Sequence, residues 1–269
     1  MGGTTSTGIT NANADIYNLV TNTKVTKTGA LAAGPRTFPG IGTCGTYNAN
    51  RAVFMGGLSG PTTPSESIQT VGGPTSYTAA STLSLATARG SGVCATFNST
   101  LYGGVVTVLF GGYVDSTSSY QNALTLYNHR NNTKVELTAV LSVPRIQLAA
   151  SVTEDGKYVV LSGGWNGTSL TAIDIYHTAN VTLARTMQLN QARAFHSSAA
   201  LGPYVYIGGG INLGMQVLDT RDWTIFNMEA LLNYSSYNTA TQVPGIGVYF
   251  AGSTNGDERI NVYTCGNSV

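Results

Sequence analysis

The chain has 269 residues, of which 42% are hydrophobic and only 9% are charged, and its formal net charge is +1. An average globular protein has roughly 25% charged residues, so this composition excludes the basic surface with which proteins neutralise nucleic-acid phosphates. No apolar run approaches the roughly 18 residues of a membrane-spanning helix, so membrane insertion is not expected. The polar residues are mostly Ser, Thr and Asn, which favour strands and turns over surface helices.

The first eight residues contain no apolar stretch of the kind that forms a signal peptide. The low charge and the many hydroxyl and amide side chains nevertheless favour an extracellular setting. We therefore expect a secreted or cell-surface protein, of which this chain is a mature or excised piece.

A short sequence motif recurs along the chain. An apolar strand ends in two small residues, a polar loop follows, and a second apolar strand ends in an aromatic or aliphatic side chain. In chain order the small pairs are Gly2-Gly3, Gly56-Gly57, Gly111-Gly112, Gly163-Gly164, Gly208-Gly209 and Ala251-Gly252. The residues that close the second strand are Tyr17, Val71, Tyr127, Tyr176, Leu218 and Tyr263.

Each full repeat contains four segments that read as strands. The first follows an arginine, as in 145–152, the second ends in the small pair, the third ends in the closing residue, and the fourth lies beyond a turn, as in 134–140. Four short strands with a period of roughly 40–50 residues and no helical periodicity predict an all-β chain built from blades of a β-propeller. The predicted blades are 1–30 (partial), 31–83, 84–141, 142–188, 189–232 and 233–269 (partial).

The glycine pairs, the strands Asp15-Ile-Tyr17 and Asp174-Ile-Tyr176, Trp223 after Leu218-Asp-Thr, and the Ala-Arg or Pro-Arg start of the first strand together resemble the kelch-repeat propellers. The resemblance covers essentially the whole chain and implies one propeller domain over 1–269, of the galactose-oxidase-like type but without its catalysis. The family usually has a Trp shortly after the Tyr. Here Lys24, Lys134 and Leu183 stand at that place.

Both ends of the chain fall within a repeat, so the first and last blades lack strands. Six blades are the first expectation and five the second. The chain is then a slice of a longer one, a five-bladed ring with an extra hairpin, or a ring that takes strands from a neighbouring subunit, because open sheet edges invite pairing.

The face on which the first strands begin is the candidate ligand site. Four arginines recur at these starts, namely Arg36, Arg89, Arg145 and Arg193. The longer loops on the same face carry Tyr113, Tyr120 and Trp165, which do not repeat and are therefore the better functional candidates. Arginine side chains bind carboxylates through paired hydrogen bonds, and aromatic rings stack on the faces of sugars. We therefore expect an anionic or carbohydrate ligand. In the alternative interpretation each arginine donates to backbone carbonyls of the neighbouring blade and is structural.

Sequons for N-glycosylation occur at Asn98, Asn131, Asn166, Asn180 and Asn233, all in predicted turns. Cys44 and Cys94 lie on first strands of neighbouring blades, which permits a disulfide and leaves Cys265 free or intermolecular. In the alternative interpretation all three cysteines are buried thiols.

Signals of catalysis are weak. The three histidines, His129, His177 and His196, are widely spaced, and the acidic residues are scattered over different loops. Some secreted propellers of the kelch type are copper oxidases with Tyr and His ligands, but no such cluster is visible, so we expect no metal and no cofactor.

We therefore expect an extracellular, glycosylated structural, adhesive or assembly module that is not an enzyme. Its partners would be another protein or copies of itself, bound through open blade edges, and glycans are a further candidate. The alternatives are a secreted carbohydrate-binding or carbohydrate-active propeller and an intracellular kelch substrate adaptor.

Overall fold

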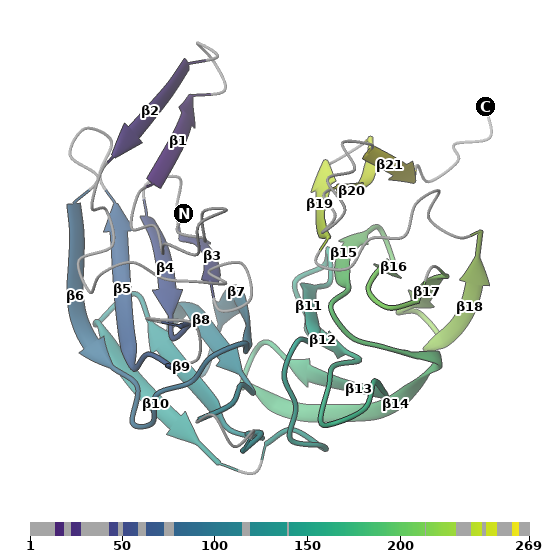
Figure 1. Cartoon of the computed structure of the whole chain (residues 1–269), viewed down its shortest axis with the longest axis horizontal. Helices are drawn as coiled ribbons and strands as arrows, with labels where there is room; N and C mark the ends of the chain where they lie inside the picture. The colour runs from purple at the N-terminus through teal and green to yellow at the C-terminus, as the bar shows by residue number, and fades with distance from the viewer. Residues whose placement is uncertain are drawn as a thin grey trace. The chain divides into compact units, whose positions relative to one another are not determined.

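A computed structural model of the chain describes residues 14–18, 23–27, 43–47, 51–58, 63–72, 78–114, 119–138, 140–212, 214–229, 238–243, 246–251 and 260–263. Within these ranges the regular structure is entirely β-strand (Figure 1), and every described strand pairing is antiparallel. The predicted all-β class is confirmed. None of the described residues belongs to a helix long and apolar enough to cross a membrane.

The strands form separate sheets in which neighbours in sequence are neighbours in space. A two-stranded sheet comprises β1 (Ala14–Asn18) and β2 (Thr23–Lys27). A four-stranded sheet comprises β3 (Thr43–Tyr47), β4 (Arg51–Met55), β5 (Ser67–Gly72) and β6 (Thr78–Ser84). A second comprises β7 (Val93–Ser99), β8 (Gly104–Phe110), β9 (Leu124–Asn128) and β10 (Thr133–Leu137).

The second half of the chain continues the same pattern. One four-stranded sheet comprises β11 (Ala149–Val152), β12 (Tyr158–Ser162), β13 (Leu170–His177) and β14 (Thr182–Arg193). The next comprises β15 (Ser197–Leu201), β16 (Tyr204–Gly208), β17 (Met215–Asp219) and β18 (Thr224–Met228). A three-stranded sheet comprises β19 (Thr239–Val243), β20 (Gly247–Ala251) and β21 (Ile260–Tyr263).

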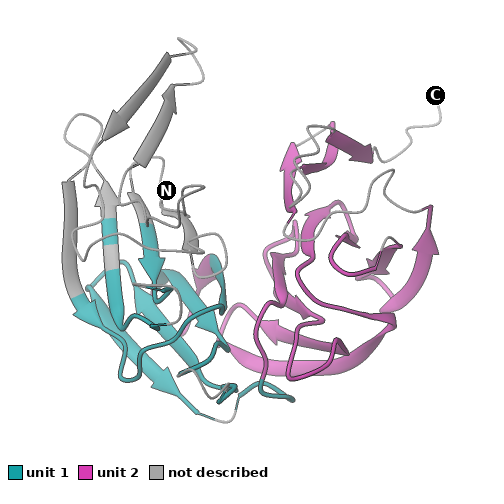
Figure 2. Cartoon of the chain, in the orientation of Figure 1, with its two compact units in different colours: residues 1–96, 104–144 teal, residues 97–103, 145–269 magenta. Residues whose placement is uncertain are grey.

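The chain divides into two compact units (Figure 2). Unit 1 contains residues 1–96 and 104–144, and unit 2 contains residues 97–103 and 145–269. The single propeller domain over 1–269 stays a prediction.

The glycine pairs end the second strand of each four-stranded sheet with two residues at positive φ. In unit 2 these are Gly163 and Gly164, with φ of 57° and 116°. A Cβ on Gly163 would lie 2.5 Å from the carbonyl oxygen of Arg193, so only glycine fits at this point. In the next sheet the positive-φ pair is Gly209 and Gly210, so the glycine pair lies one residue later than the predicted Gly208-Gly209.

In unit 1 the sheets β3–β6 and β7–β10 share a hydrophobic cluster. Val53, Met55 and Ile68 come from the first sheet, and Leu109 and Tyr127 come from the second. The Tyr127 ring is buried while its hydroxyl donates to Oδ1 of Asn132 at 2.6 Å. The aromatic residue at the end of the third strand therefore packs in the core through its ring and stabilises the following turn through its hydroxyl.

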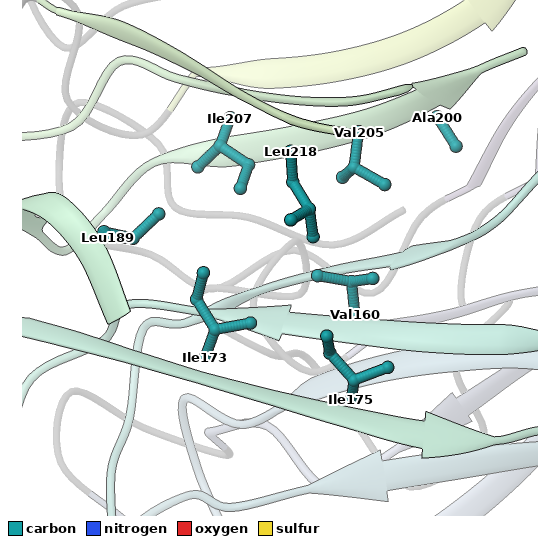
Figure 3. Packing of buried hydrophobic residues seen from close by; sticks show 8 residues of the cluster. All are labelled: Val160, Ile173, Ile175, Leu189, Ala200, Val205, Ile207 and Leu218. Atoms are coloured by element: carbon teal, nitrogen blue, oxygen red, sulfur yellow. The ribbon is translucent and has the colours of Figure 1, made fainter. Parts of the chain in front are cut away.

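In unit 2 the sheet β15–β18 is apolar on both faces. Along β16, Val205 and Ile207 join one cluster, with Val160, Ile173 and Ile175 of the sheet β11–β14 (Figure 3). Tyr206, between them in sequence, joins a second cluster with Val248 and Phe250 of the sheet β19–β21. Because alternate residues of a strand point to opposite faces, β15–β18 is the middle layer of three stacked sheets. Each fully buried aliphatic side chain contributes about 1.5–3 kcal/mol.

β14 is the longest described strand and runs to Arg193, past the predicted boundary at residue 188. Its pairing with β13 shifts register between Leu170 and Ala172 and again between Ile175 and Tyr176. These irregularities let one continuous strand lead directly to the arginine ahead of β15.

Candidate functional site

The recurring arginines lie four residues ahead of a first strand. Arg89 precedes β7, Arg145 precedes β11 and Arg193 precedes β15. All three side chains are buried, with 2%, 0% and 0% of their surface exposed. Arg36 lies outside the described residues. The described arginine side chains are therefore buried, and each contacts strands of the sheet that it precedes. Their use as ligand contacts stays a prediction.

Arg89 binds the sheet β7–β10 through both ends of its guanidinium group. Nη1 donates to the carbonyl oxygens of Gly111 and Ala123 at 3.3 and 3.0 Å, and Nη2 donates to Oγ1 of Thr125. Glu136 lies 3.7 Å from Nη2 and accepts from the same threonine hydroxyl. Burial lowers the pKa of Arg89, and the Glu136 carboxylate opposes this effect.

Arg145 forms an ion pair inside the sheet β11–β14. Its Nη2 donates to Oδ2 of Asp174 at 3.0 Å, and neither side chain is exposed. Burial lowers the pKa of Arg145 while Asp174 raises it. Burial also raises the pKa of the neighbouring Tyr176, and the Asp174 charge adds to that rise.

Arg193 has the same position in the sheet β15–β18 but no carboxylate near it among the described residues. Its Nη1 donates to the carbonyl oxygens of Ile207 and Gly209 at 3.4 Å, and its Nε and Nη2 atoms are buried without a hydrogen bond. Burial lowers the pKa of Arg193 to about 10. The position that holds Asp174 in the preceding sheet holds Gln216 here, two residues before Leu218.

A serine and a histidine pair beside this arginine. Oγ of Ser162, at the end of β12, lies 3.0 Å from Nε2 of His196, and both residues are buried. Burial and the nearby charges of Arg193 and Arg145 lower the pKa of His196 well below its usual value, so its ring is neutral at neutral pH. A hydroxyl beside a neutral imidazole is the arrangement of a nucleophile and its general base. Ser162 is 0% exposed, however, and no substrate reaches it in this conformation.

Sequence reasoning treated His196 as a lone residue and missed this pair. The one sequence feature that could have indicated the pair is Ser162, a polar residue at the end of the apolar strand 158–162. Unit 1 contains a related polar chain, in which Oγ1 of Thr107 lies 2.8 Å from Oγ1 of Thr96 and 2.7 Å from Nε2 of His129.

Tyr113 and Trp165 follow the glycine pairs of two sheets that are consecutive in the sequence, and their backbones are held in the same way. Tyr113 exchanges backbone hydrogen bonds with Gly90, at 2.9 and 3.0 Å, and Trp165 does so with Ile146, at 2.8 and 3.0 Å. The position thus recurs although the side chain varies. Tyr120 is joined to Tyr113 by an isolated bridge.

The aromatic rings at these positions are half-buried. Burial raises the pKa of Tyr113. The Trp165 ring lies 6.5 Å from that of Phe195 within unit 2. Their use as ligand contacts stays a prediction.

Three sequon asparagines are exposed, Asn98, Asn131 and Asn180, whereas Asn166 is half-buried and Asn233 lies outside the described residues. In two sequon turns the threonine hydroxyl donates to the asparagine Oδ1 at 2.7 Å, from Thr133 to Asn131 and from Thr182 to Asn180.

The third such turn has aspartate in place of asparagine, and there Thr224 donates to Asp222 at 2.8 Å. The middle residues of the three turns, Asn132, Val181 and Trp223, all have positive φ.

Cys94 is disulfide-bonded. The side chains of Cys44 and Cys265 lie outside the described part of the chain, so the pairing with Cys44 stays a prediction. Within the described residues no group of three or more His, Cys, Asp and Glu side chains is arranged to hold a metal ion.

No protein-family model matches this sequence, and comparison with curated proteins finds no match.

Proposed function

We propose that the chain is a kelch-like β-propeller module that works outside the cell as a structural, adhesive or assembly unit without catalysis. Successive four-stranded antiparallel sheets, stacked face to face within a unit, support the propeller assignment. The glycine pairs and buried arginines that recur in these sheets support the kelch resemblance.

One observation carries the assembly role. Seven large hydrophobic side chains are exposed in the described residues, and five of them lie near the last, three-stranded sheet, namely Phe226, Met228, Ile246, Ile260 and Val262. By strand register Phe226 and Met228 lie on the face of β15–β18 that packs on the last sheet, and Ile260 and Val262 lie on the opposite face of that last sheet. Exposed apolar surfaces are the places where a partner protein binds. A partner that covers them is therefore part of the proposed function.

The absence of catalysis is proposed because the polar groups best arranged for chemistry are inside the sheets. Ser162, His196, Arg145 and Asp174 are all buried. Ser162 pairs with His196 and Arg145 pairs with Asp174, so these groups contact one another inside the sheets rather than a substrate.

Sedimentation velocity of the purified chain over a range of concentrations tests the assembly role. We expect dimers or larger species that dissociate on dilution. A chain that stays monomeric at every concentration, including the highest reached, contradicts the proposal.

The extracellular setting is tested by the mass of the chain from its native source. We expect added mass at several of the exposed sequons, Asn98, Asn131 and Asn180, removable by an amidase that cleaves N-linked glycans. A bare polypeptide mass contradicts the glycosylated extracellular form.

A second candidate is carbohydrate binding on the face that carries Trp165. The half-buried Trp165 beside Phe195 has the partly exposed aromatic surface on which sugar rings stack. A glycan array should then report binding that Trp165→Ala abolishes. Tyr249→Ala, a half-buried aromatic residue elsewhere in the chain, should leave it unchanged.

A further inference from the structure

Arg193 of unit 2 leaves one edge of its guanidinium group without a hydrogen bond. Nη1 donates to the carbonyl oxygens of Ile207 and Gly209, whereas Nε and Nη2 have no acceptor among the described residues. The N–H bonds of Nε and Nη2 point in the same direction, so these two atoms form a planar fork. The edge that is not used is therefore the one that holds both oxygens of a carboxylate, or one small anion between its two hydrogens.

The positive charge of Arg193 also lacks a counter-charge. Its side chain is 0% exposed, and no described carboxylate lies within ion-pair distance of it. In the preceding sheet Nη2 of Arg145 donates to the carboxylate of Asp174. Buried charges in proteins are paired, because an isolated buried ion loses its hydration without compensation. The same arginine position in β15–β18 therefore calls for a negative charge.

The side chains nearest to this position in the sheet do not supply that charge. Gln216, at the place of Asp174, is neutral, and its amide lies 3.0 Å from the side chain of Asn227 on β18. His196 contributes no negative charge either, because burial lowers its pKa and keeps its ring neutral at neutral pH. A ligand is thus the remaining source.

The unused edge of Arg193 lies close to the protein surface at Gly214, the residue before β17. A Cβ added to Gly214 would lie 3.9 Å from Nη2 of Arg193 and 2.9 Å from Oε1 of Gln191. Gly214 is half-buried and Gln191 is exposed. A methyl group at residue 214 would therefore contact the guanidinium group, and a small ion can reach the edge through local opening at this point.

We propose that Arg193 binds a small monovalent anion through Nε and Nη2, and that this ion is the counter-charge that Asp174 provides in the sheet β11–β14. Chloride and a short carboxylate such as formate share the required chemistry, which is one negative charge on an ion small enough to enter a site with no exposed surface. The inference is independent of the assembly role, since Arg193 is wholly buried.

The test is urea unfolding of the whole chain at fixed protein concentration and ionic strength, at about pH 8, where histidine is neutral in both states. Chloride or formate replaces gluconate, an anion too large for a buried site. A ligand that binds only the folded chain stabilises it, so we expect the urea midpoint to rise with the logarithm of the anion concentration above its dissociation constant. A response to both ions, or to one alone, identifies the anions that bind. A midpoint that depends on neither ion overturns the proposal.

Variants assign the response to the guanidinium group. Arg193→Met removes the charge, and we expect the response to be lost. Gln216→Asp is the second variant, should the first fail to fold by circular dichroism. It places a carboxylate beside Arg193, and we expect the anion to bind about tenfold more weakly or not at all. Arg185→Met is the matched control, because it removes the same charge from an exposed position of β14, and the response should persist.

Gly214→Ala tests the position of the ion without changing any charge. The added methyl group lies beside Nη2, and we expect the apparent affinity for the anion to fall about tenfold. An unchanged affinity in this variant overturns the assignment to the Nε and Nη2 edge. An undiminished response in Arg193→Met or Gln216→Asp also overturns the proposal, as does a response that Arg185→Met abolishes, because the effect then belongs to other charges.

Discussion

The guanidinium group of Arg145 lies 3.0 Å from the carboxylate of Asp174, and both side chains are wholly shielded from solvent. Two opposite charges in the interior stabilise each other, but removal of one leaves the other desolvated and uncompensated. The pair connects the approach to β11 with the middle of β13 and fixes how these strands meet.

The first prediction concerns this ion pair. Asp174→Asn should lower the free energy of unfolding by about 3–5 kcal/mol, because Arg145 stays buried without its counter-charge. Chemical denaturation followed by tryptophan fluorescence measures the change. The control is Asp155→Asn, which breaks the exposed 3.1 Å pair with Lys157 and should cost less than about 1 kcal/mol. Equal losses for the two variants would contradict the prediction.

The second prediction concerns Arg193, whose counter-charge is absent among the described residues. Gln216 occupies the position of Asp174 in its sheet, so Gln216→Asp should pair with Arg193 and raise the free energy of unfolding by about 1–2 kcal/mol. The matched background is Arg193→Met, in which the same aspartate has no cation and should destabilise the protein. An equal change in both backgrounds would show that the two positions do not interact.

The third prediction is a pH dependence from His196. Its pKa in the folded protein is well below the unfolded value of about 6.5, so below pH 6.5 the unfolded chain binds a proton that the folded chain does not. Its contribution to stability is therefore present above pH 6.5 and is lost as the pH falls, by up to about 1.4 kcal/mol per pH unit.

Thermal unfolding between pH 7 and pH 5 measures this loss. His196→Gln should reduce the pH slope, because it removes the group whose pKa is lower in the folded chain than in the unfolded chain. A slope that His196→Gln does not alter would assign the effect to other groups.

The fourth prediction separates steric crowding from backbone strain at the glycine pairs. Gly163 and Gly202 share the same φ of 57°. A Cβ at Gly163 would approach the Arg193 carbonyl oxygen to 2.5 Å, but a Cβ at Gly202 would meet nothing within 4 Å. Gly202→Ala should therefore cost about 1 kcal/mol and Gly163→Ala about 3 kcal/mol or more. Denaturant midpoints of the two variants provide the comparison.

The fold class could be predicted from the sequence because strand alternation and the small-residue pairs are local signals. The position of the fifth glycine pair could not be predicted, since residues 208–210 are three consecutive glycines. Packing decides which two of the three glycines form the pair. A Cβ on Gly210 would lie 2.2 Å from the Ala194 carbonyl oxygen, the same kind of contact that Gly164 makes with Ile146.

The buried polar pairs were less accessible to sequence reasoning. Arg145 and Asp174 are separated by 29 residues, and Ser162 and His196 by 34. Which residues meet at such distances depends on strand register, and a shift of one residue would send the side chain to the other face. The arginine repeat indicated a common role, but only the structure shows the atoms to which each one donates.

The turns at Asn131, Asn180 and Asp222 bear on how the Asn-x-Thr sequences arose. Each is closed by a threonine hydroxyl on the side-chain oxygen of the residue two positions earlier, and aspartate serves as well as asparagine. Selection for a tight hairpin would therefore create the Asn-x-Thr signal as a by-product, without selection for a glycan. The same equivalence makes Asn131→Asp and Asn180→Asp conservative replacements that delete the acceptor amide while the hairpin keeps its own hydrogen bond.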